Sequence, residues 1–176
     1  IVGRPGEDLA TFGRGFSQLA ALKPHEIQVG ILKRLKGTSI TALTAEFGML
    51  YSPVPPYEVV QTDALPFGEL QRLKRFARVW ELYGNRGDFK QSLALLLESG
   101  DTAFTAILDL SDWLADVEGR VHSLSLLRLA ERLLEWLLPT HGDGARDAVV
   151  ADYAQGGRRK PSHKLLGTTG PARQKA

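Results

Sequence analysis

Two segments with the pattern of β-strands lie close to the start of the chain and flank one amphipathic helix. Ile1-Val2-Gly3 leads through a Pro-Gly turn into a helix predicted from Asp8 to Leu22, and Glu26 to Leu32 has alternating apolar positions. Two strands joined by a helix in this way form a right-handed parallel crossover. A pair of parallel strands is not a stable sheet by itself, so we expect further strands to complete the unit.

Two short extended segments are predicted before residue 62. Met49–Ser52 and Tyr57–Thr62 flank the run Pro53-Val54-Pro55-Pro56. Proline cannot donate a hydrogen bond to a neighbouring strand, so this pair belongs at the edge of a sheet. We therefore interpret residues 1–62 as an α/β unit.

From Asp63 onwards the apolar residues recur at helical spacing. Connections of two to six residues predict that the helices pack as antiparallel neighbours, so we expect residues 63–156 to form a helical domain. The helices are predicted from Pro66 to just before Gly84, and at Phe89–Glu98, Thr102–Val117, Val121–Leu138 and Ala145–Gln155.

The last twenty residues, 157–176, differ in composition from the rest of the chain. They contain six basic residues and no acidic residue, although the whole chain carries a net charge of only +2. A segment with so few large apolar side chains buries too little surface to offset its conformational entropy, so we expect a disordered basic tail. The alternative is an arm that binds polyanions such as nucleic acid.

Several kinds of site are excluded or not predicted. The chain has no cysteine, so it forms no disulfide and holds no iron–sulfur cluster through its own thiolates. The four histidines are scattered along the sequence, and we predict no metal site. No run approaches the about 20 apolar residues of a membrane span. We therefore expect a cytoplasmic protein without membrane contact.

The candidate binding residues lie at and near the carboxyl ends of the two predicted parallel strands, where the sites of parallel α/β proteins collect. Gly3 and Gly30 allow a ligand to approach the backbone closely. Gln28 is the polar side chain on the face opposite Ile27 and Val29. It either points into the lumen of a barrel or is a hydrogen-bonded interior amide.

Three stretches carry a resemblance to a known family. Ile1–Asp8 (Ile-Val-Gly-Arg-Pro-Gly-Glu-Asp) and Glu26–Thr38 resemble late strands of the barrel in cobalamin-binding radical S-adenosylmethionine (SAM) enzymes. Arg4 stands where the family usually has an apolar residue. Segments further along resemble the C-terminal domain of unknown function, of the DUF4080 type, that follows the barrel in one subgroup. These segments are Tyr51-Ser52, Pro55–Val59 and Asn85–Phe89.

The resemblance implies an α/β fragment followed by an all-α region, namely the last strands of a radical SAM-type (β/α) barrel and a C-terminal helical bundle. It implies that Ile1, Gly3, Gly30 and Leu32 contact the adenine of SAM, and we add Gln28 as a candidate cofactor-binding residue from its place on the strand. The parent enzyme would use SAM, a 4Fe-4S cluster and cobalamin. This chain alone would bind none of them and would not be catalytic.

The chain starts at Ile1 and its only methionine is Met49, so we expect a longer polypeptide. On the first hypothesis, the partner of this chain is the remainder of that polypeptide, with a small-molecule or peptide substrate and no nucleic acid. On the second hypothesis, the chain is a stand-alone helical binding module with a basic, nucleic-acid-binding tail.

Overall fold

The first three residues pair in parallel with the segment around Ile31. A computed structural model describes residues 1–155 and 157–168. The Val2 N–H donates to the Gly30 carbonyl at 2.8 Å, and the Leu32 N–H donates to the Val2 carbonyl at 2.9 Å. Helix α1 (Leu9–Ala21) connects the two segments and begins at Asp8, whose carboxylate accepts from the Thr11 N–H. The predicted parallel crossover is confirmed, although each segment is much shorter than a regular strand.

The other extended segments continue this small sheet on its opposite side. Strands β1 (Leu50–Tyr51) and β2 (Val59–Gln61) pair antiparallel. An antiparallel bridge between Lys33 and Glu58 joins β2 to the segment that also pairs with Val2. The short helix η1 (Ser39–Leu43) lies in the loop that leads to β1. The segments are therefore ordered residues 1–3, residues 30–34, β2 and β1, and the two predicted extended segments are confirmed.

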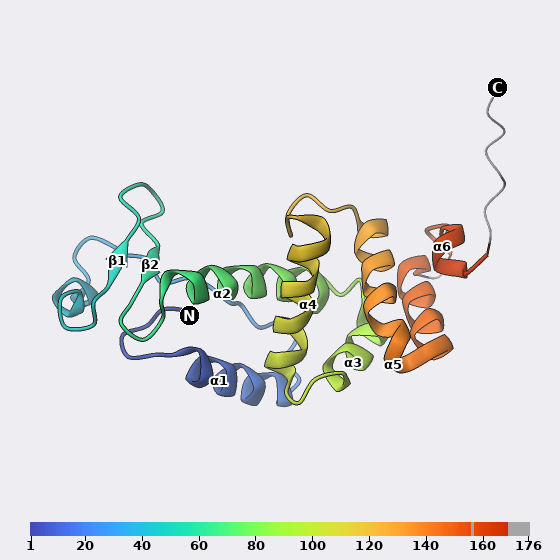
Figure 1. Ribbon diagram of the computed structural model, residues 1–176, viewed down its shortest axis with the longest axis horizontal. Helices are drawn as coiled ribbons and strands as arrows, with labels where there is room; N and C mark the ends of the chain where they lie inside the picture. Colours follow the sequence, from blue (N-terminus) through green and yellow to red (C-terminus); the bar gives the residue numbers. More distant parts are fainter. Residues whose placement is uncertain (156, 169–176) are drawn as a thin grey trace, which may run out of the picture.

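Helices form most of the described chain after β2 (Figure 1). They are α2 (Phe67–Trp80), the π-helical turn η2 (Glu81–Asn85), α3 (Lys90–Glu98), α4 (Ala103–Glu118), α5 (Leu126–Ala154) and α6 (His163–Leu166). In Figure 1, α1 and α2 run side by side, α4 crosses next to them, and α5 and α6 lie at the end away from the strands. The predicted helical region is confirmed.

The fifth helix differs from its prediction in two ways. It begins at Leu126 rather than Val121, because the Ser125 hydroxyl caps it by accepting from the Arg128 N–H. Two separate helices around Pro139 were expected, but the helical run passes Pro139 and bends at Gly142, where φ is 55° and ψ is −135°. Glycine adopts such angles without the clash of a Cβ atom, so the bend lies at the glycine rather than at the proline.

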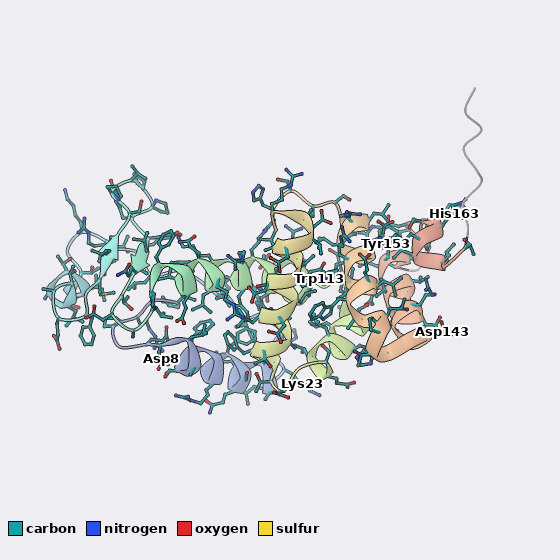
Figure 2. All side chains as sticks on the ribbon, in the orientation of Figure 1. Asp8, Lys23, Trp113, Asp143, Tyr153 and His163 are labelled. Atoms are coloured by element: carbon teal, nitrogen blue, oxygen red, sulfur yellow. The ribbon has the colours of Figure 1, made fainter. Side chains whose placement is uncertain are left out.

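An aromatic cluster lies where α1, α2 and α4 meet. The ring of Phe16 packs edge-on against Phe76 at 4.8 Å and against Trp80 at 4.9 Å, and Phe12 packs edge-on against Phe104 at 5.8 Å between ring centres. Figure 2 shows Trp113 on α4 at the side that faces α5. The ring centre of Trp113 lies 5.4 Å from that of Trp136 of α5. Residues of the strands, α1 and the later helices thus belong to one apolar core.

The expectation of disorder from residue 157 is wrong for the part of the tail that the structure describes. Helix α6 packs against α5 and buries Leu165 completely. The Arg146 guanidinium donates to the Leu165 carbonyl at 2.8 Å, and the Ser162 hydroxyl donates to Glu131 at 2.9 Å. One buried leucine and these hydrogen bonds supply the contacts that composition alone did not reveal. The expectation for residues 169–176 lies outside the described residues.

We predict that Leu165→Ala releases α6 from α5. Truncation of a fully buried leucine costs about 2–5 kcal/mol, which is large for a helix of one turn. Trypsin should therefore cleave the variant after Arg158 and Arg159 faster than it cleaves the wild type. Leu166→Ala is the matched control, because Leu166 is 45% exposed. Equal cleavage of wild type and Leu165→Ala would contradict the docking of α6.

Candidate functional site

Four of the predicted binding residues flank the parallel bridge. Ile1 and Gly3 lie on either side of Val2, and Gly30 and Leu32 lie on either side of Ile31. Ile1 and Gly30 are exposed, Leu32 is half-buried and Gly3 is buried. The structure thus brings these residues together, although only part of the group faces solvent.

The chain itself occupies the space around Gly3 and the backbone of Leu32. Gly3 has φ +83°, and a Cβ atom at this position would lie 2.5 Å from Cγ1 of Val59. Leu32 donates its N–H to Val2 and accepts at its carbonyl from the Val59 N–H at 2.9 Å. Packing against β2 therefore explains the glycine at position 3, whereas a Cβ at Gly30 would meet open space.

Gln28 lies at the surface of the described chain. Its Nε2 donates to Glu26 Oε1 at 3.1 Å, and the side chain is exposed. It is therefore not the interior amide that was one of the two interpretations.

A cavity of about 380 Å³ opens between α1 and the strand segments, and we call it the edge cavity. Ile1 and Gln28 line it together with Arg4 and Glu7. Apolar side chains from α1 and from the segment around Ile27 make up much of the remaining wall. They are Phe12, Phe16, Leu19, Ile27 and Val29. Two of the five predicted site residues thus share one cavity.

Glu7 is the acidic residue that lines this cavity, and it was not among the candidate residues of the sequence. It is only 5% exposed, and the Arg4 guanidinium donates to its Oε1 at 2.6 Å. Its Oε2 is buried and has no hydrogen-bond partner among the described residues. The neighbouring carboxylate, Asp8, caps the helix. Arg4 has a role as the ion-pair partner of Glu7. The three-residue spacing of these opposite charges was the signal in the sequence that could have indicated the pair.

Asn85 holds the second strand segment in place against the end of α2. Its Oδ1 accepts from the Ile27 N–H at 3.2 Å, and its Nδ2 donates to the Ile27 carbonyl at 3.1 Å. The Trp80 indole donates to the same carbonyl at 2.9 Å. The side-chain amide thus satisfies both backbone groups of Ile27 as a neighbouring strand would, and it fixes one wall of the edge cavity.

We predict that Asn85→Ala lowers the free energy of unfolding by about 1–3 kcal/mol, because the Ile27 N–H loses its acceptor. The Ile27 carbonyl keeps Trp80 as a donor. Urea unfolding followed by circular dichroism measures the loss. Gln91→Ala is the matched amide control, since Gln91 is exposed, and it should change stability by less than about 0.5 kcal/mol. Equal stabilities of the two variants would contradict the role of Asn85.

A cluster of charged residues ties the end of α4 to α5. Arg128 Nε donates to Glu118 Oε1 at 2.7 Å, and Arg132 Nε donates to the same oxygen. Arg132 also donates to Glu135, which lies 3.7 Å from the Lys164 ammonium of α6. The hydrogen bond from Arg132, together with the one from Arg128, holds the pKa of Glu118 below its ordinary value. We interpret this cluster as structural, because its groups satisfy one another.

We predict that Glu118 makes stability depend on pH in the acid range. Its pKa is lower in the folded than in the unfolded chain, so its contribution is complete above the ordinary value of 4.5 and is lost as the pH falls through the folded pKa. The stability difference between wild type and Glu118→Gln should therefore shrink from neutral pH to about pH 3. Asp116→Asn, an exposed carboxylate on the same helix, is the control. A difference that is constant with pH would refute the assignment.

In residues 1–155 and 157–168, no three or more His, Cys, Asp or Glu side chains come close enough to hold a metal ion. No helix in that part of the chain combines the length and apolar character that a membrane span requires.

Comparison with known proteins identifies the family of the chain. A family model for proteins of unknown function, DUF4080, matches residues 45–175. The match covers more than half of the chain, so the chain belongs to the DUF4080 family. Neither the curated proteins nor the solved structures contain a match to it.

Proposed function

We propose that this chain is the C-terminal part of a cobalamin-dependent radical SAM enzyme, in which its strand segments complete the barrel and its helices cover or shape the barrel mouth. One observation carries the proposal. The pairing of Val2 with Ile31 is parallel and crosses over through a helix, as in a (β/α) barrel. The other edge of residues 1–3 has no partner among the residues described, so a further strand has room to pair there.

Two further observations support the proposal. The family match assigns residues 45–175 to a domain of the type that the resemblance of the sequence suggested. The strand segments are too short to form a stable sheet by themselves, and Ile1 is 65% exposed at their open edge. Both features agree with a chain whose sheet belongs to a larger barrel.

The residues of this chain do not fit an iron–sulfur cluster, because such clusters are held by cysteine thiolates and the chain has none. We therefore assign the cluster and cobalamin to the remainder of the proposed enzyme. The fit to SAM is partial. Ile1, Gln28 and Gly30 offer exposed surface to an adenine, whereas Gly3 and the backbone of Leu32 are engaged within the chain. The chain by itself is then a structural part of the enzyme rather than its catalytic centre.

The alternative, a helical module that binds nucleic acid through its tail, gains less support. Arg159 lies 3.5 Å from Asp88, and Lys164 lies 3.7 Å from Glu135. These two cations face acidic groups of the same chain, which reduces the charge that they offer to phosphates. No feature of the described surface favours this alternative over the first proposal.

We predict that the coding sequence continues in frame upstream of Ile1 and encodes a Cys-x-x-x-Cys-x-x-Cys motif, which holds three irons of a 4Fe-4S cluster. Sequencing of the upstream DNA is the first measurement. After anaerobic reconstitution the longer gene product should show iron–sulfur absorbance and cleave SAM, whereas the 176-residue chain, as the control, should do neither. An in-frame stop codon directly upstream, or an upstream region without the motif, would refute the proposal.

A further inference from the structure

The open edge of residues 1–3 has the geometry of a strand that lacks a neighbour. Val2 directs both its N–H and its carbonyl to the segment around Ile31, at 2.8 and 2.9 Å. The Ile1 carbonyl and the Gly3 N–H point to the opposite edge, because the N–H and C=O of one trans peptide point in opposite directions and Val2 uses its own two groups on this side. In residues 1–155 and 157–168 nothing pairs with them. An unpaired strand edge of this kind is a template for strand addition.

Glu7 is a second, independent observation at the same edge. Its side chain is only 5% exposed, yet its Oε2 has no partner in the part of the chain that is described. Arg4 contacts the other oxygen, and the Arg4 side chain is 61% exposed and stays partly in water. A buried carboxylate oxygen without a donor is unfavourable, so the site is incomplete as it stands.

The walls of the edge cavity indicate what completes it. Phe12, Phe16 and Ile27 form an apolar floor, and Ile1 and Leu19 at the rim are 65% and 51% exposed. A small cation would satisfy Glu7, but it would leave these apolar side chains and the strand edge uncovered. An added strand with apolar side chains and one basic side chain would pair with the open edge, cover the apolar side chains and donate to Glu7.

We propose that the edge cavity receives an added β-strand that pairs with Ile1 and Gly3 and places a Lys or Arg side chain against Oε2 of Glu7. The inference rests on the proposed function, since the strand would belong to the upstream part of the same polypeptide. It goes beyond that function by naming the residue through which this chain recognises the strand. A charge-assisted hydrogen bond then fixes the strand in one register, and the apolar walls cover its remaining side chains.

The test uses hydrogen exchange at the Gly3 amide in the longer gene product. We expect this amide to exchange at least about tenfold more slowly there than in the 176-residue chain, because the added strand protects it. Glu7→Gln in the longer product should remove most of this protection. Glu46→Gln is the matched control, since Glu46 is exposed and lies away from the edge cavity, and it should leave the protection unchanged.

A second variant separates recognition from loss of folding. Glu7→Gln in the 176-residue chain should change its melting temperature only slightly, because the amide oxygen of glutamine can still accept from the Arg4 guanidinium, and the Arg4 side chain is 61% exposed to water. Replacement of the basic residue of the added strand by Met should reduce protection of Gly3 as much as Glu7→Gln does, and the two changes together should reduce it no further.

Three outcomes would overturn the inference. They are protection of Gly3 that does not depend on Glu7, an added strand without Lys or Arg near Glu7, and a Gly3 amide that exchanges equally fast in both proteins. In all three cases the upstream cysteine motif and the cleavage of SAM would still stand, so the proposed function would survive. Absence of an upstream reading frame would refute the proposed function and remove the strand with it.

Discussion

The aromatic cluster between α1, α2 and α4 is the contact on which the rest of the structure depends. Phe12 and Phe16 come from the α/β unit, whereas Phe76 and Phe104 come from the helical region. Edge-on packing of these rings joins two parts of the chain that differ in secondary structure. The contact is close because residue 13 is a glycine, where a Cβ would lie 2.4 Å from the Phe104 ring. The position of the strands therefore depends on the helices.

The sequence predicted the elements whose pattern is local. Helix α1 was expected because the apolar residues after the Pro-Gly turn recur at helical spacing, and the parallel pair followed from the order of strand, helix and strand. Prediction from the sequence failed where contacts between residues far apart along the chain determine the local structure. Leu165 is buried only because α5 lies beside it, and composition contains no information about that neighbour. The bend at Gly142 likewise depends on the backbone angles of one residue rather than on the more conspicuous Pro139.

The candidate site illustrates the same limit. The glycines at the strand ends were recognised as places of close approach, and at Gly3 the approaching group is Val59 of the same chain. Glu7 was not singled out, because its exposure depends on how the turn directs its side chain beneath Arg4. Opposite charges three residues apart predict that Arg4 and Glu7 can form an ion pair. They do not predict that Oε2 of Glu7 is buried without a hydrogen-bond donor among the described residues.

The family match begins later in the chain than the apolar core does. The match begins at residue 45, but Ile27 is held by Asn85 and Trp80, and Phe104 packs on Phe12. Without the first 32 residues the side chains of Phe76, Trp80 and Phe104 would lose apolar neighbours and become exposed. The helical region of this chain thus needs the strand–helix–strand unit of its first residues on which to pack. In the enzyme that we propose, the last crossover of the barrel would supply such a unit.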